Sequence, residues 1–421
     1  MPLKQRSGKV KETNKSVPAE PSDKPGEESK EQKQPNPPTE RQQKRGGRCS
    51  SLLKKFGYFS LIIIVPTVLN YAALNQEAKA LVPEDGVLYD IGWGQKLLLR
   101  CTGEGLPTVV LEAPIGQSSD VWSLVQPLLA KRTRVCLYDR AGLGFSDRGH
   151  RNISEYANDM SEAALDRGRT EVSTVERMAD DLHRLLSYST NQPKPLLLVG
   201  VDFSTFISRF YTQLYEHEVA GLFLIDPAIE NLLDFDPSSE TTPTSTEQPE
   251  SLGWPEFWNS KLVPSIHGKW LSSAIGFTRI AVMVGLSSAL EEPSLKEILP
   301  NDVILRKKHF LCQPKHQSSA YEEMRQMNRS MNQVKTVLQV KPFPRDLPIV
   351  IATFKDGDSS SKLKKTWTAG QNMLSQTLLP SSKHILLPGE DYLSLYQHSQ
   401  QVAIAILSAV ENWRKKSELP A

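Results

Sequence analysis

The stretch Leu196-Leu197-Leu198-Val199-Gly200-Val201-Asp202-Phe203-Ser204 decides how this chain is read. Four apolar residues lead into a glycine, and a helix-like segment follows at 205–211, which predicts a strand that turns sharply into a helix. This is the outline of the G-x-S-x-G turn that lifts a nucleophile above a sheet. Gly200 holds the first glycine position, Asp202 the nucleophile position and Ser204 the last glycine position. The turn is therefore predicted, but an aspartate stands where a serine is usual.

Short apolar runs alternate with helix-like segments on both sides of this turn. Such alternation predicts a mostly parallel sheet covered by helices on both faces. A hairpin that turns at 92–94 is expected to precede it. The expected strands are 86–91, 96–101, 108–112, 134–139, 196–199, 219–225, 347–353 and 383–387, and the expected helices are 119–131, 175–186, 205–215 and 400–413.

An insertion at 227–345 separates two of the expected strands. It begins with a Ser/Thr/Pro/Glu-rich stretch, 234–251, of the kind found in surface loops. Its middle, 254–286, carries several aromatic residues among apolar ones, which favours a helical lid over the sheet. A helical subdomain without any role in binding is the alternative. The aromatic residues are Trp254, Phe257, Trp258, Trp270 and Phe277.

The N-terminal part of the chain has a different character. Residues 1–55 are polar, carry 14 Lys and Arg against 7 Asp and Glu, and are expected to be a disordered basic tail. The segment 56–75 is uncharged and apolar, close to the roughly 20 residues that span a bilayer. The alternatives are a signal peptide, which rarely follows such a long polar stretch, and a core helix, which would show a polar face.

The charges that flank this segment predict its orientation. Five Lys and Arg residues between 44 and 55 precede it, so the positive-inside rule places the N-terminus in the cytoplasm and the folded domain in a lumen or outside the cell. Sequons at Asn152 and Asn328 are candidate glycosylation sites on that far side. Cys49, beside the basic cluster, is either palmitoylated or a free thiol.

Composition excludes some classes of function. Beyond residue 55 the chain carries 36 Lys and Arg against 41 Asp and Glu, so the folded part is no basic nucleic-acid binder. The four cysteines show no paired spacing, which suggests neither a disulfide framework nor a zinc site, and no other metal site is expected. Cys101 and Cys136 fall in expected strands and are interpreted as buried thiols.

Several motifs together resemble the α/β-hydrolase superfamily over residues 83–416, most closely the branch of proline iminopeptidase-like and esterase-like serine hydrolases. The most specific is 135–147, Val-Cys-Leu-Tyr-Asp-Arg-Ala-Gly-Leu-Gly-Phe-Ser-Asp, which resembles the family's D-x-x-G-x-G-x-S block. Segments 107–116, 219–226 and 382–389 resemble the strand before the oxyanion loop, the strand after the nucleophile, and the strand before the catalytic histidine. The resemblance implies an α/β-hydrolase fold with an eight-stranded, mostly parallel sheet, a helical lid and no cofactor, here preceded by one transmembrane helix.

The resemblance also assigns site residues, and several depart from the family pattern. The oxyanion loop would comprise Pro114 and Ile115 together with Phe203, yet proline has no N–H to donate. Asp202 takes the nucleophile position. Aligning the final segment puts Asp391, or alternatively Glu390, where the histidine belongs. The acid position is represented by Asp356 or Asp358.

An aspartate can attack carbon, and epoxide hydrolases of this superfamily use one, but they need a histidine to activate water. His384 opens the last strand and His398 lies beyond the expected slot, so neither fits. The carboxyl of Asp202 is otherwise expected to cap the following helix, or to meet Asp391 or Glu390, in which case one pKa should rise.

These observations lead to three hypotheses. The first is a membrane-anchored protein with a degenerate site, which binds a lipid, a small molecule or a partner protein. The second is an active ester, amide or epoxide hydrolase that uses Asp202 as nucleophile. The third is a scaffold in which the fold serves only adhesion or assembly.

Overall fold

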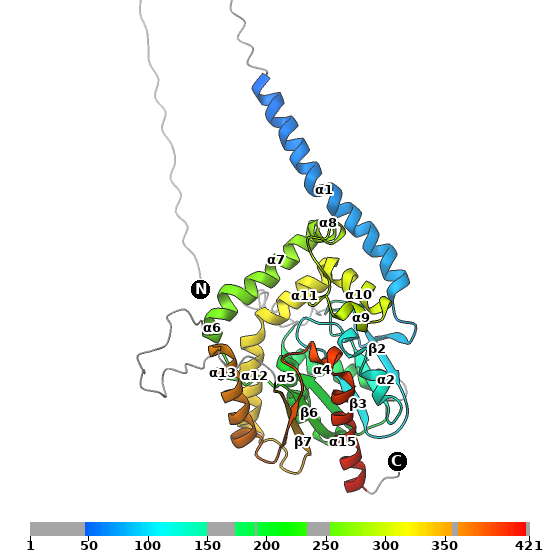
Figure 1. The fold of residues 1–421 in the computed structure, drawn as a ribbon, viewed down its shortest axis with the longest axis vertical. Helices are drawn as coiled ribbons and strands as arrows, with labels where there is room; N and C mark the ends of the chain where they lie inside the picture. Colours follow the sequence, from blue (N-terminus) through cyan, green and yellow to red (C-terminus); the bar gives the residue numbers. More distant parts are fainter. Residues whose placement is uncertain (1–46, 150–172, 190–191, 234–252, 356–360, 418–421) are drawn as a thin grey trace, which may run out of the picture. The chain divides into compact units, whose positions relative to one another are not determined.

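A computed structural model describes residues 47–149, 173–189, 192–233, 253–355 and 361–417. Its centre is one eight-stranded sheet in the order β1-β2-β4-β3-β5-β6-β7-β8 (Figure 1). All pairs from β4 to β8 are parallel, whereas β1 with β2 and β2 with β4 are antiparallel. The strands are β1 (Gly86–Asp90), β2 (Lys96–Thr102), β3 (Thr108–Leu111), β4 (Val135–Tyr138), β5 (Leu196–Val201), β6 (Val219–Ile225), β7 (Ile349–Phe354) and β8 (Lys383–Leu387).

The central strands are buried on both faces, which explains their uninterrupted apolar sequence. Every residue of β5 and β6 is buried. Alternate residues of β5 face opposite cores: Leu196 and Leu198 belong to one, Leu197 and Val199 to the other. The predicted mostly parallel eight-stranded sheet and the hairpin at its edge are confirmed.

Helices cover both faces of the sheet. The core that contains Leu198 is closed by α4 (Val175–Tyr188), α5 (Thr205–Leu214) and α12 (Met327–Val340), and the core that contains Leu197 by α15 (Ser399–Ser417). The expected helix at 119–131 is wrong as a single element. The segment forms the 3₁₀ turn η1 (Ser119–Trp122) and the short α2 (Gln126–Leu129) instead, and Trp122 is fully buried.

Further helices lie between β6 and β7 in the chain. Figure 1 shows most of them gathered at one end of the sheet, with α11 alongside α7, whereas α12 lies along one face of the sheet. They are α6 (Trp254–Phe257), η6 (Trp258–Leu262), α7 (Val263–Ala274), α8 (Phe277–Met283), α9 (Leu295–Ile298), α10 (Asn301–Cys312), α11 (Pro314–Arg325) and α12. The remaining elements are η3 (Asp202–Ser204), η4 (Glu216–Glu218), α13 (Lys362–Met373), η7 (Leu374–Leu378) and α14 (Ser394–Gln397).

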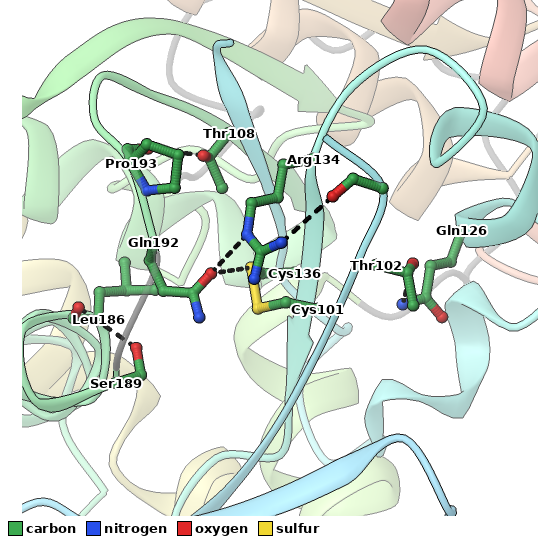
Figure 2. The surroundings of a disulfide bond; sticks show 11 residues. Cys101, Thr102, Thr108, Gln126, Arg134, Cys136, Leu186, Ser189, Gln192 and Pro193 are labelled. Atoms are coloured by element: carbon green, nitrogen blue, oxygen red, sulfur yellow. Dashed lines mark hydrogen bonds between the residues drawn. A yellow bond between two sulfur atoms is a disulfide. The ribbon is translucent and has the colours of Figure 1, made fainter. Parts of the chain in front are cut away.

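The interpretation of Cys101 and Cys136 as buried thiols is wrong. They form a disulfide that joins β2 to β4, with 4.1 Å between their Cα atoms (Figure 2). The two residues face each other directly in the antiparallel register. Spacing along the chain does not show register, because a cross-strand pair forms wherever two strands happen to align. Cys312 is free and buried.

The helix α1 (Gly47–Leu81) contains the predicted apolar segment and extends beyond it at both ends. Within it, Lys54–Leu81 is long and apolar enough to cross a membrane, and only 11% of its most apolar window is buried. Large apolar side chains on it are therefore exposed, among them Phe56, Ile62 and Leu69. Residues Phe56–Ala421 form one compact unit.

Candidate functional site

The site is organised by the turn at the carboxyl end of β5. The strand ends at Val201, the 3₁₀ turn η3 follows, and α5 begins at Thr205. Asp202 has a φ of +57°, in the left-handed region that L side chains rarely adopt. Gly200 is required because a Cβ there would lie 2.9 Å from the Ser208 hydroxyl and from the Cα of Thr205. This is the strand-to-helix geometry that presents a nucleophile, and it holds Asp202 at its apex.

Ser204 is no substitute nucleophile. Its side chain is fully buried and turns back to the end of β5. The hydroxyl donates to the Val201 carbonyl at 2.7 Å and accepts from the Val201 N–H at 2.9 Å. The serine that replaces the usual glycine at position 204 therefore stabilises the turn through two hydrogen bonds to Val201.

The carboxyl of Asp202 is held in an environment that opposes its ionisation. Burial is the largest cause of a pKa raised to about 8; the charge of Asp226 raises it further, the Phe203 N–H lowers it, and Asp391 adds a smaller increase. Its Oδ1 atom is buried and has no hydrogen-bond partner among the described residues. At pH 7 Asp202 is therefore mostly a neutral acid. The expectation that its side chain caps α5 is wrong, because no side chain forms a capping hydrogen bond at the start of that helix.

Two further carboxyls act on Asp202. Asp226 directly follows β6, has a φ of +45° and accepts a hydrogen bond from Gln371 Nε2 at 2.7 Å; burial raises its pKa. Asp391 accepts a hydrogen bond from the Leu393 N–H at 2.8 Å. Loss of water around Asp391 raises its pKa, although the residue remains exposed as a whole. The cluster therefore consists of acids at the ends of three separate segments.

Glu390, the alternative in the histidine position, is exposed, and its N–H donates to the Ser394 hydroxyl at 3.1 Å. Asp391 is the one of the two whose charge acts on Asp202. The predicted acid positions Asp356 and Asp358 lie outside the described residues. Among the described residues no group of acids, histidines and cysteines has the arrangement of a metal site.

The segment predicted to be the oxyanion loop is bound by an arginine. The Arg140 guanidinium donates to the carbonyls of Ala113 at 2.6 Å and Pro114 at 2.9 Å. The same guanidinium pairs with Glu323 of α11, Nε to Oε1 at 2.7 Å and Nη2 to Oε2 at 3.0 Å. The residues involved are buried, so this fork-to-fork pair is shielded from water.

Glu323 also reaches the oxyanion loop itself. The Gly116 N–H, one of the donors left after Pro114, donates to Glu323 Oε2 at 2.7 Å. The Phe203 N–H, the donor expected from the turn, acts on the carboxyl of Asp202 and lowers its pKa. The Gly116 donor is thus already bound to a carboxyl group of the chain. An oxyanion hole requires donors aimed at the oxygen of a substrate.

A second buried carboxyl supports this arrangement. Glu112 accepts a hydrogen bond from the Tyr138 hydroxyl, and its Oε2 lies 3.6 Å from Nη1 of Arg140. Burial raises its pKa to about 7, against the opposing effects of Arg140 and Tyr138. A small cavity of about 10 Å³ lies beside Arg140 and Glu323, which is room for about one water molecule.

The histidines considered from the sequence have other roles. His384 is exposed on β8, and its Nε2 lies 2.8 Å from the Thr353 hydroxyl. His398 lies on the loop between α14 and α15, where its ring approaches Gly389. Neither is among the groups that shift the pKa of Asp202.

Sequence reasoning missed three functional neighbours: Asp226, Arg140 and Glu323. Asp226 was detectable, because it follows a buried strand directly, and carboxyl ends of adjacent parallel strands meet at one edge. Arg140 stood within a recognised motif without an assigned partner. Glu323 gave no signal, since its partners lie 183 and 207 residues away along the chain.

A wide groove lies at the opposite end of the sheet strands, where β3, β4 and β5 begin. It measures about 760 Å³ and is lined by residues that precede β3, β4 and β5, together with the end of α4. Figure 2 shows Arg134 and Gln192 of this region above the Cys101–Cys136 disulfide. Asp202 stands at the carboxyl end of β5, so the groove is no part of its surroundings.

Residues 105–347 match the family model described as alpha/beta hydrolase fold. The chain belongs to this family. Among curated proteins it is 24% identical over 128 residues to the uncharacterized protein YqjL of Bacillus subtilis. That match covers 30% of this chain and 42% of YqjL, so the chain spans less than half the length of this relative.

Solved structures of the same fold include the Cif epoxide hydrolase from Acinetobacter nosocomialis, with 14% identity, a TM-score of 0.55 and coverage of 82% of this chain and 96% of that one. Cfl2 from Burkholderia cenocepacia is likewise 14% identical, with a TM-score of 0.52 and coverage of 77% and 95%. Identities this low establish a shared fold and leave the chemistry to be argued from the site.

Proposed function

We propose that this protein is a membrane-anchored, catalytically degenerate member of the α/β-hydrolase family that binds a lipid or small molecule at the Asp202 site. One observation carries the proposal: the group at the apex of the nucleophile turn is a buried acid with a pKa raised to about 8, and the charges of Asp226 and Asp391 add to that increase. A nucleophilic carboxylate must be ionised, and its ester must be cleaved by activated water. Neither requirement is met by the described neighbours of Asp202.

The same arrangement suits binding. A neutral carboxyl can donate one hydrogen bond through its O–H and accept others, and the unpartnered Oδ1 of Asp202 is available for this. Asp391, at the surface, supplies a further acceptor. A ligand that carries a hydroxyl or an amine satisfies both groups, and a cationic amine would gain from the charge of the cluster.

The test is hydrolysis of short and long p-nitrophenyl esters and of an aryl epoxide by the full chain and by Asp202→Asn. The proposal predicts equal turnover for the two proteins, at the level of a blank without enzyme. Glu390→Gln is the matched control, because it removes an exposed carboxyl next to Asp391 that is not among the groups acting on Asp202. Turnover well above the blank that disappears only in Asp202→Asn would refute the proposal.

That outcome would favour the second candidate, an active hydrolase. Two observations support it: the left-handed backbone of Asp202, a strain that functional sites retain, and the shared fold with an epoxide hydrolase. Such an enzyme would need ionised Asp202, so its rate should rise with pH up to about 8.

For the anchor, we propose that Lys54–Leu81 spans a membrane with the N-terminus in the cytoplasm. The exposed apolar surface of α1 supports a span, and the basic residues that precede it support the orientation. The Cys101–Cys136 disulfide supports an oxidising compartment for the folded domain. Asn328 is exposed, as a glycan acceptor must be, and Asn152 lies outside the described residues.

The orientation is tested by endoglycosidase treatment of protein from cells. A mass shift that is lost in the Asn152→Gln/Asn328→Gln double variant supports the proposed orientation. Digestion of the folded domain by protease added from the cytosolic side, with residues 1–50 protected, would overturn it.

A further inference from the structure

Apolar side chains are exposed along the second half of α7, along α8 and just beyond. Arg279 is the single charged residue between Trp270 and Leu286. It is ion-paired, with Nη1 and Nη2 donating to the two carboxylate oxygens of Glu77 at 2.6 and 2.9 Å. The exposed apolar residues, called here the α7–α8 patch, are Leu271, Ile275, Phe277, Ile280, Met283, Val284 and Leu286.

Figure 1 shows α8 beside α1, whose apolar side chains are also exposed, so the patch adjoins the apolar surface of α1. Gly276, between α7 and α8, lies directly against the α1 backbone: a Cβ on it would stand 2.3 Å from the Pro66 carbonyl oxygen. Asn70 of α1 is buried and donates to the carbonyls of Ser273 at 3.2 Å and Cys312 at 3.0 Å. The polar groups between α1 and the α7–α8 segment are thereby hydrogen-bonded, and the side chains that both present to the surface are apolar.

The position of this contact along α1 sets its depth. Pro66 precedes Leu74, the last apolar residue before the charged Glu77, by eight residues. At about 1.5 Å per residue that separation is about 12 Å along the helix axis. A hydrocarbon core is about 30 Å thick, so the turn at Gly276 would lie within the outer leaflet if α1 crosses the bilayer.

The pairing of polar groups fits such a depth. Side chains that can ionise are expensive in hydrocarbon unless they pair with one another, and Arg279 pairs with both Glu77 and the Asn70 side chain, which accepts from its Nε at 2.7 Å. Backbone groups inside a membrane must be satisfied within the protein, and α7 and α8 are helical.

We propose that the α7–α8 patch is a second membrane-inserted element, seated in the lipid of the outer leaflet beside α1. The proposal rests on the membrane anchor proposed above and adds a surface to it. The occupant is lipid and not a second copy of the chain, because the patch continues the exposed apolar surface of α1, which a bilayer would cover along its whole length. The lid would then rest in the membrane from which a lipid ligand comes.

The experiment measures the depth of single spin labels in the full chain reconstituted in phosphatidylcholine vesicles. Cys49→Ser removes the N-terminal thiol, while Cys312 is buried and Cys101 and Cys136 are bonded. Labels at Met283→Cys, in the patch, and Ile62→Cys, in α1, are compared with Val340→Cys. Val340 is 81% exposed at the end of α12, far along the chain from both.

Access to oxygen, which concentrates in lipid, is measured against access to a water-soluble nickel chelate. The proposal predicts that the labels at 283 and 62 are reached several-fold better by oxygen than by nickel, and the label at 340 the reverse. If the label at 62 lies in lipid and the label at 283 in water, this inference fails and the anchor stands.

Two other outcomes would also refute the inference. If labels at 62 and 283 are both reached by nickel, the anchor and the inference fail together. If the label at 283 is shielded from both reagents and shows dipolar coupling between chains, the patch binds a second copy, and insertion into lipid is refuted.

Discussion

Replacing Asp202 by asparagine should stabilise the folded chain at neutral pH, although it changes the central residue of the site. The pKa of Asp202 is raised to about 8 in the folded state by burial, then by Asp226. In the unfolded chain an aspartate has a pKa of about 3.9. Between these values the folded state binds more protons than the unfolded one, so stability is complete below about pH 4 and falls as pH rises toward 8.

The magnitude follows from the shift. Each pKa unit corresponds to about 1.36 kcal/mol, so about three units between pH 4 and pH 7 amount to about 4 kcal/mol of lost stability, as an upper value. Asparagine has nearly the same shape and cannot ionise, so this loss disappears. The free energy of unfolding of Asp202→Asn should therefore exceed that of the wild type by an amount that grows with pH and levels off above about 8.

The assay is urea unfolding of the full chain in detergent, followed by tryptophan fluorescence at intervals from pH 4 to pH 9. Glu390→Gln, which neutralises an exposed carboxyl nearby, should follow the wild type at every pH. The reasoning is refuted if Asp202→Asn and the wild type keep a constant difference across this range, because Asp202 would then ionise as readily in the folded chain as in the unfolded one.

Three further predictions concern the framework. Cys101→Ala/Cys136→Ala should lose about 3.8 kcal/mol of stability, the loop-closure value for a separation of 35 residues, and a reductant should lower the urea midpoint of the wild type but not of this variant. Glu323→Ala should lower the free energy of unfolding by about 3–5 kcal/mol because it removes the carboxylate that pairs with the buried Arg140 guanidinium, whereas Glu322→Ala should cost little; equal losses would contradict a stabilising role of the Arg140–Glu323 pair. A fluorophosphonate probe should not label the protein, because Ser204 is buried and hydrogen-bonded, and labelling that survives Ser204→Ala would show that the nucleophile lies elsewhere.

Much of the fold was predictable because its signals are local. The buried parallel strands are short apolar runs, and those runs fixed the order of strands and helices from β1 to β8. The failures were non-local. The disulfide depends on the register of β2 against β4, and the irregular segment at 119–129 depends on burial of Trp122.

The residues of the candidate site also divide into those with a local sequence signal and those placed by non-local packing. Asp202 was identifiable from its position in a strand-to-helix motif, and the effect of Asp391 on it from an alignment of the last strand. Asp226 acts on Asp202 because two parallel strands end side by side, and Glu323 reaches Gly116 because α11 folds back over the loop. Such contacts arise from the packing of distant segments, which no local pattern records.

The central claim is that Asp202 is a neutral acid, and infrared difference spectroscopy tests it most directly. The spectrum of Asp202→Asn is subtracted from that of the wild type at a series of pH values. The account predicts the carbonyl band of a protonated carboxylic acid at pH 6 and pH 7, lost as the pH passes about 8. A carboxylate band at pH 6 in its place would contradict the account and return Asp202 to the role of nucleophile.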